Sequence, residues 1–136
     1  MRPTFEQLYM KLAFSLSERA TCSRRSVGAV ITSADYAHVY GIGYNGRERG
    51  GPNKCARPNE QGNCGCLHAE DNAILKCNHG SEVPKIMFVT DQPCEYCARR
   101  IVNKGGFIEV YYSRDYHNPR GVEILKAANI IVEKLG

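Results

Sequence analysis

Apolar residues recur at helical spacing near the start of the chain and then in short strand-like runs. Residues 5–20 place them close to a 3.6-residue period, behind a capping-box pattern that starts at Thr4. The runs 27–32 and 38–42 are typical of strands, and the turn residues 33–35 between them predict a hairpin.

Helix-like and strand-like segments then alternate to the end of the chain. The expected elements are a helix over 67–77, a strand over 86–90, a helix over 93–104, a strand over 107–112, a helix over 120–128 and a strand over 130–132. Strands joined by helices run parallel through right-handed crossovers. The pattern therefore predicts a three-layer α/β domain, with a five-stranded mixed sheet whose later strands are parallel.

Composition limits the classes of protein to which the chain can belong. Its 136 residues fit one domain, and 43% hydrophobic with 24% charged residues exclude a disordered or fibrous chain. No stretch is long and apolar enough to predict a membrane span, and no signal-peptide pattern is present, so a cytoplasmic protein is expected, in the host cytoplasm if phage-encoded. A net charge of +4 is too weak to predict a nucleic-acid partner.

Seven cysteines are the anomaly. Their number is odd and no secretion signal accompanies them, which favours metal binding over a disulfide framework. Three of them lie in a glycine-rich segment at about 45–66 that has few large apolar side chains. A loop of this length is uncommon in a compact domain unless something holds it. We therefore expect a metal-stapled insertion there.

The strongest chemical signal is His68-Ala69-Glu70 followed by Pro93-Cys94-Glu95-Tyr96-Cys97. Cys94 and Cys97 fall one helical turn apart at a helix start, so both sulfurs face the same way. Three protein ligands with an open fourth position are typical of a catalytic zinc. Glu70 is then free to act as an acid and base beside the metal. A structural zinc half-site or a redox pair remains the plainer interpretation of an isolated C-x-x-C.

These motifs resemble those of the zinc-dependent cytidine and deoxycytidylate deaminase superfamily, whose signature is H-x-E with P-C-x-x-C. Within it, the chain resembles the deoxycytidylate (dCMP) deaminases, particularly those of phages. The resemblance covers nearly the whole chain and rests on CSRRSVGAVI (22–31), GYNG (43–46), HAEDNAIL (68–75) and SRDYHN (113–118).

The resemblance implies a cytidine-deaminase-like fold and hydrolysis of dCMP to dUMP and ammonia, which feeds dTMP synthesis. His68, Cys94 and Cys97 would hold one catalytic zinc, and the activated water would attack C4 of the cytosine. Glu70 would take the water proton, protonate N3 and assist the departure of ammonia.

Substrate and effector sites are expected on the same grounds. The candidate substrate-binding residues are Asn45, Ala69, Tyr116, Tyr112, Arg24 and Arg25, the two arginines for the phosphate. The candidate allosteric residues are Gly43, Tyr44, Asn45 and Gly46. The resemblance implies activation by dCTP and inhibition by dTTP with Mg²⁺. It also implies a homo-oligomer, with a hexamer as the expected size. Asn-Gly is also a strong turn signal by itself, so a purely local role for the motif stays open.

A second, structural zinc is implied by phage relatives that carry one. Cys22 and Cys55 match the expected positions, and Cys66 stands where the family has a histidine. Cys64 is the expected fourth ligand, and the chain here departs from the histidine-containing pattern of the family. Such a four-cysteine site would be closed and tetrahedral. Free thiols in a loose loop are the alternative.

Three other functions share some of these features. A tRNA adenosine deaminase has the same motif pair but needs a more basic surface. A polynucleotide cytosine deaminase of the same fold needs an open groove with further aromatic and arginine side chains. A non-enzymatic zinc-binding interaction module would have two closed metal sites and no role for Glu70.

Overall fold

The computed structural model describes residues 1–60 and 64–136. Its elements follow the predicted order: α1 (Phe5–Ser17), β1 (Gly28–Ser33), β2 (Val39–Tyr44), α2 (Ala69–Lys76), β3 (Lys85–Asp91), α3 (Glu95–Lys104), β4 (Phe107–Arg114), α4 (Arg120–Ala127) and β5 (Ile131–Lys134). The predicted insertion at 45–66 includes residues 61–63, which lie outside the described residues.

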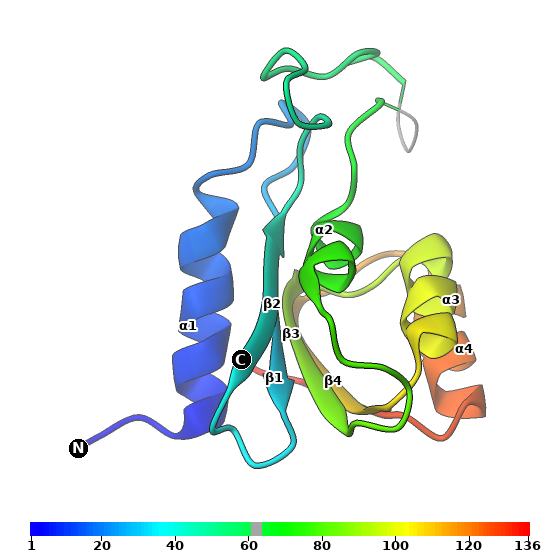
Figure 1. The fold of residues 1–136 in the computed structure, drawn as a ribbon. Helices are drawn as coiled ribbons and strands as arrows, with labels where there is room; N and C mark the ends of the chain where they lie inside the picture. The colour runs from blue at the N-terminus through cyan, green and yellow to red at the C-terminus, as the bar shows by residue number, and fades with distance from the viewer. Residues whose placement is uncertain (61–63) are drawn as a thin grey trace.

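The five strands form one mixed sheet in the order β2-β1-β3-β4-β5. β1 pairs antiparallel with both β2 and β3, whereas β3, β4 and β5 run parallel. The predicted hairpin and the predicted parallel strands are therefore confirmed. Helix α1 lies on one side of the sheet and α2, α3 and α4 lie on the other (Figure 1), which makes the three expected layers.

Alternating side chains of the central strands fill two cores. Val30 of β1 and Phe88 of β3 pack with Met10 and Ala13 of α1. The intervening residues of the same strands, such as Ile31, pack under α2, α3 and α4. Every residue of β1 and β3 is buried, as expected for strands covered on both faces.

Local signals set the helix ends. Thr4 and Gln7 form the predicted capping box at the start of α1. Gly105 follows α3 with a φ of 81°, a conformation that glycine adopts without strain. Within the described residues, no helix has the length and apolar character that crossing a bilayer requires.

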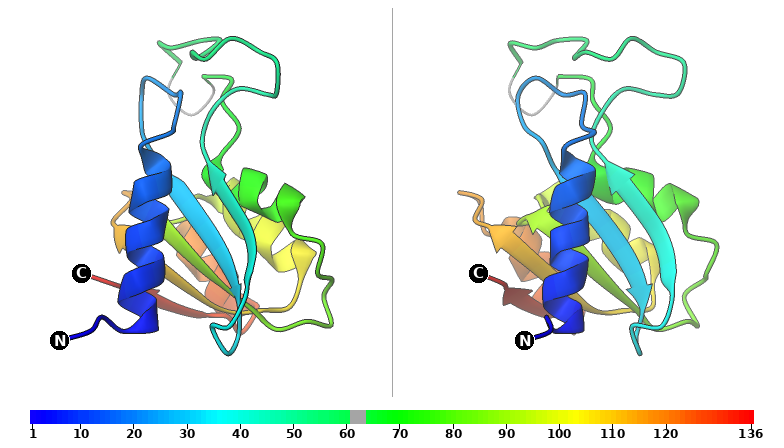
Figure 2. Two further views of the ribbon diagram at one scale, coloured as in Figure 1. Left: turned by 60° about the vertical axis from the view of Figure 1, so that its left-hand side comes forward. Right: turned by 90° about the vertical axis from the view of Figure 1, so that its left-hand side faces the viewer.

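The loop after α1 and the segment that follows β2 meet at one end of the molecule, beyond the sheet (Figure 2). A backbone bridge between Gly46 and Leu67 closes the base of that segment. The chain between these two residues therefore leaves and re-enters the domain at one place, immediately before His68.

Candidate active site

His68 stands at the N-cap of α2, where the insertion returns to the domain. Glycines in the neighbouring strand β2 let helix α2 approach the strand closely. A Cβ atom added to Gly43 of β2 would lie 2.4 Å from the carbonyl oxygen of Ala69, and one added to Gly41 would lie 2.5 Å from that of Ala73. The backbone of α2 thus packs directly on β2, which fixes where His68 lies relative to the sheet.

Cys94 and Cys97 lie at the start of α3, directly after β3. The sulfur of Cys94, the N-cap residue, accepts a hydrogen bond from the backbone N–H of Cys97 at 3.5 Å. The Nδ1 atom of His68 lies 3.7 Å from Sγ of Cys94 and 3.2 Å from Sγ of Cys97. Two helix starts on the same face of the sheet therefore bring one nitrogen and two sulfur donors together.

This donor set fits a zinc ion. The three ligand atoms lie within 4.8 Å of one another. Zinc bonds of about 2.0–2.3 Å in a tetrahedron separate neighbouring nitrogen and sulfur ligands by roughly 3.5 Å. The group has three members among the residues that the structure describes, so a tetrahedral ion there would keep one position for a ligand from outside the protein.

Glu70 lies within the first turn of α2 and is almost fully buried, with 5% of its surface exposed. Burial raises the pKa of its carboxyl group to about 7, although the nearby His68 opposes that rise. A carboxyl group whose pKa is close to 7 can both accept and deliver a proton at neutral pH. Its neighbour Asp71 instead forms an ion pair with Arg100 of α3, which joins the two helices beside the site.

The thiols of the pair differ in how readily they ionise. Hydrogen bonds from Cys97 and His68 lower the pKa of Cys94 to about 4, against the effect of burial. The hydrogen bond to Cys94 and burial raise the pKa of Cys97. The hydrogen bond with Cys94 raises the pKa of His68 to about 9. One thiolate is thus already favoured before any cation is present, which suits a site for a divalent metal.

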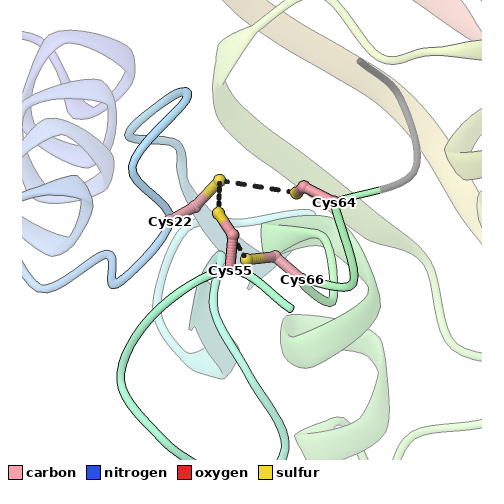
Figure 3. Close-up of side chains that lie close together, drawn as sticks. All are labelled: Cys22, Cys55, Cys64 and Cys66. Atoms are coloured by element: carbon pink, nitrogen blue, oxygen red, sulfur yellow. Dashed lines mark hydrogen bonds between the residues drawn. The ribbon is translucent and has the colours of Figure 1, made fainter. Parts of the chain in front are cut away.

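A second group of four cysteines gathers where the loop after α1 meets the insertion. The sulfurs of Cys22, Cys55, Cys64 and Cys66 point toward one another (Figure 3) and lie within 4.8 Å of one another. Sγ of Cys22 lies 3.4 Å from that of Cys55 and 3.7 Å from that of Cys64, and Sγ of Cys66 lies 3.5 Å from that of Cys55. Tetrahedral zinc with four bonds of about 2.3 Å separates its sulfurs by roughly 3.8 Å. These four side chains therefore also fit a metal.

Asn45 and Arg25, both expected to bind substrate, are bonded to each other. The Asn45 side chain is buried: its Nδ2 donates to the carbonyl oxygen of Arg25 at 2.7 Å, and its Oδ1 accepts from the N–H of Val27 at 2.9 Å. Asn45 thus fixes the loop that carries Arg25. The guanidinium of Arg25 in turn lies 6.0 Å from the ring centroid of Tyr116.

The other expected substrate residues are spread more widely. Arg24 donates to the carbonyl oxygen of Pro58 in the insertion at 2.7 Å, while Ala69 is fully buried at the start of α2. Tyr112 of β4 packs against the core. Tyr116 lies after β4, and its backbone N–H donates to the side chain of Gln92, two residues before Cys94, at 3.3 Å. The structure thus brings Arg25 and Tyr116 together, and holds Arg24 and Tyr112 in separate contacts.

The candidate allosteric segment is built into the fold. Gly43 touches the backbone of α2, and Gly46 makes the bridge to Leu67. The carbonyl oxygen of Tyr44 accepts from Asn72 at 2.8 Å, and its ring lies 5.8 Å from the guanidinium of Arg19. Each of these residues therefore has a structural contact, and an effector site there stays a prediction.

Sequence reasoning missed two charged residues near Cys94. Asp91 is the last residue of β3 and is buried, and Arg114 is its register partner at the end of β4. Arg114 lies in the segment SRDYHN, whose resemblance pointed to Tyr116. The signal that could have found both is their place at the carboxyl ends of adjacent parallel strands, where α/β proteins bind ligands.

Comparison with known proteins agrees with this geometry. Residues 3–113 match the family described as the cytidine and deoxycytidylate deaminase zinc-binding region. A deoxycytidylate deaminase of Saccharomyces cerevisiae is 34% identical over 98% of the chain, which spans 46% of that protein, less than half its length. One from Mycobacterium phage D29 is 30% identical over 76% of the chain and 91% of its own length.

A solved structure gives the same result for the fold. The dCMP deaminase of the cyanophage S-TIM5, in complex with dCMP and dUMP, superimposes with a TM-score of 0.86 at 30% identity, over 99% of both chains. The expected cytidine-deaminase-like fold is thus confirmed. With the family match over most of its length and the donor set at its two helix starts, the chain belongs to the cytidine and deoxycytidylate deaminase zinc-binding family.

Proposed function

We propose that this chain catalyses the hydrolytic deamination of dCMP to dUMP and ammonia. The gathering of His68, Cys94 and Cys97 beside a buried Glu70 is the observation that carries the proposal. The names of the yeast and phage relatives, and the dCMP and dUMP in the cyanophage structure, support the choice of substrate.

The three donors would hold zinc, which in an open site would lower the pKa of a water so that hydroxide is available near neutral pH. Glu70 would accept a proton from this water while the water oxygen forms its bond to C4 of the cytosine. The carboxyl group would deliver this proton to N3 and later carry the remaining proton of the added hydroxyl group to the C4 amino group. The C4–N bond breaks, ammonia leaves, and the uracil carbonyl remains. Burial of Glu70 keeps bulk water from competing for these protons.

The test uses the purified full chain with zinc and three substrates: dCMP, adenosine in a tRNA anticodon stem-loop, and cytosine in a single-stranded oligonucleotide. Loss of cytosine absorbance and release of ammonia with dCMP alone are expected. Deamination of either polynucleotide, with dCMP unchanged, would favour the other deaminases of this fold. Zinc binding without deamination of any of the three would support an interaction module instead.

We further propose that the four-cysteine cluster holds a second, structural zinc. Support comes from the convergence of four sulfurs from two segments at distances that suit a tetrahedral ion. Such an ion would staple the insertion, at about 45–66, to the loop after α1, and the insertion with the rest of residues 1–136 would form one domain. Two zinc ions per chain, measured by elemental analysis, are expected; one would remove this site.

Regulation and assembly remain proposals of the family resemblance. We expect activation by dCTP, inhibition by dTTP with Mg²⁺, and a homo-oligomer, a hexamer, in the cytoplasm. The regulation is tested by measuring velocity against dCMP concentration with and without each triphosphate. A hyperbolic curve that is unchanged by dCTP and by dTTP would contradict the regulation. Light scattering of the purified chain tests the assembly.

A further inference from the structure

The carboxylate of Asp91 holds two arginines from different parts of the chain. Its Oδ2 accepts a hydrogen bond from Nε of Arg25 at 2.5 Å. Its Oδ1 accepts from Nε and Nη2 of Arg114 at 3.0 and 2.7 Å, and from Thr90 at 2.7 Å. The Asp91 side chain is 7% exposed, whereas those of Arg25 and Arg114 are 46% and 49% exposed. An enclosed carboxylate thus fixes two half-exposed guanidinium groups.

This group has more positive charge and more donors than the carboxylate uses. Two arginines and one aspartate leave a net charge of about +1. Within residues 1–60 and 64–136, the Nη atoms of Arg25 and the Nη1 atom of Arg114 have no hydrogen-bond partner, while Nη2 of Arg114 also donates to Ser26. Guanidinium groups match phosphate oxygens in geometry as well as charge. The arrangement therefore suits an anion that has several acceptor oxygens.

The same group lies close to the candidate active site. Asp91 and Arg114 are register partners on parallel strands, so both lie at the carboxyl edge of the sheet, from which α3 also starts. Two residues, Gln92 and Pro93, separate Asp91 from Cys94, so their Cα atoms lie about 11 Å apart at most. Between them, Gln92 donates to the carbonyl oxygen of Asn118 and accepts from the N–H of Tyr116. The loop after β4 is thereby bonded to the strand that leads into the metal donors.

We propose that Arg25 and Arg114 bind the 5′-phosphate of the nucleotide substrate and that Asp91 is the positioning residue that holds both. The inference rests on the proposed function. It adds Arg114 and Asp91 to the phosphate site expected from sequence and leaves out Arg24, whose guanidinium contacts the insertion. This phosphate site would make the chain selective for nucleotides over nucleosides, because deoxycytidine has no phosphate for the two arginines to bind.

The experiment compares kcat/KM for dCMP and for deoxycytidine, using the full chain with zinc. Arg114→Gln and Arg25→Gln are each expected to lower kcat/KM for dCMP roughly 10- to 100-fold, the effect of losing a charge-assisted hydrogen bond. The value for deoxycytidine should stay within about twofold, because the chemical step does not use these side chains. Inorganic phosphate should inhibit the wild type competitively against dCMP and inhibit the variants more weakly.

Asp91→Asn tests positioning, since it keeps the shape and removes the charge that orients both arginines. Its KM for dCMP should rise while kcat is kept, and Arg114→Lys should recover part of what Arg114→Gln loses. Arg99→Gln removes an equally charged but 67% exposed side chain of α3 that pairs with Glu95, and it should leave the dCMP to deoxycytidine ratio unchanged.

The outcomes separate the two proposals. A wild type that deaminates neither substrate overturns the proposed function and this inference with it. The inference alone is overturned if the wild type is active on dCMP but Arg114→Gln and Arg25→Gln lower kcat/KM equally for dCMP and deoxycytidine, or lower it for neither. If circular dichroism shows that Arg114→Gln does not fold, the ratio of kcat/KM for dCMP to that for deoxycytidine in Arg25→Gln decides in the same way. This variant should fold because the Arg25 side chain is half-exposed and lies on a loop.

Discussion

The Sγ atom of Cys97 lies 3.2 Å from Nδ1 of His68, although 29 residues separate them in the chain. Neither residue reaches the other through a flexible loop: one caps α2 and the other lies in the first turn of α3. Because both helices start beside the same sheet, the distance is set by the fold. Substitutions of the site residues themselves should therefore act through their chemistry, with the backbone left in place.

Glu70→Gln should abolish turnover without removing the metal. The amide keeps the size of the side chain but cannot take a proton, so we expect the deamination rate to fall roughly 10²- to 10⁴-fold. The rate of dCMP loss and the zinc content of the same sample check both parts. A Glu70→Gln variant that turns over at the wild-type rate contradicts the proposed role of the carboxyl group.

Cys97→Ala should remove one zinc ion per chain together with the activity. Loss of a ligand leaves a nitrogen and one sulfur, too few for a tight site. Elemental analysis after dialysis measures the metal. Cys77→Ala is the matched control, because Cys77 is also buried, lies in the core next to α2 and belongs to neither cysteine group. Equal zinc contents in the two variants would argue against the assignment.

Cys55→Ala should lower stability more than it lowers chemistry. Cys55 is buried, and its sulfur contacts those of Cys22 and Cys66 and accepts from the N–H of Ser23 at 3.3 Å. If the four cysteines hold a zinc, the variant loses the staple between the insertion and the loop after α1. We expect a lower Tm and one zinc ion fewer per chain than in Cys77→Ala, measured by calorimetry and elemental analysis. Equal Tm values would contradict a structural metal.

Glu109→Gln should stabilise the protein at neutral pH and lose that advantage in acid. Partial burial, and then the charges of Glu133 and Glu6, raise the pKa of Glu109 in the folded protein. A carboxyl group with a raised folded pKa destabilises the fold while it is ionised, and this penalty disappears as the pH falls through that pKa.

The expected effect is modest because Glu109 is only partly buried. A Tm gain of roughly 1–3 °C at pH 7 should shrink toward zero near pH 4. Thermal melts at both values measure it, with the exposed Glu82→Gln as control. A gain that is the same at both pH values would show that removal of the charge is not its cause.

The helices and strands could be predicted because each carries its own period and end signals. The helix predicted over 5–20 ends earlier, at Ser17. There the backbone N–H of the C-cap residue Glu18 donates to the carbonyl oxygens of Ser15 and Leu16. The strand predicted over 107–112 continues to Arg114 because its end pairs with Asp91. Such boundaries depend on contacts with other elements, which a local pattern does not contain.

The donors of the candidate site could be predicted for the same reason: H-x-E and P-C-x-x-C each lie within one helical turn. The Asp91 group could not, because its members come from three segments and no short motif joins them. Asn45 illustrates a further limit. Its motif suggested a ligand contact, and only the fold shows that its amide fixes the loop of Arg25.

The contact of Gly41 and Gly43 with the backbone of α2 leaves no room for even one carbon atom. A methyl group at either position would push the helix outward and carry the imidazole of His68 away from the two sulfurs. Alanine at these two sites should therefore behave as a remote inactivating mutation. A genetic screen for lost activity would recover it, although it alters none of the proposed zinc donors and leaves Glu70 in the sequence.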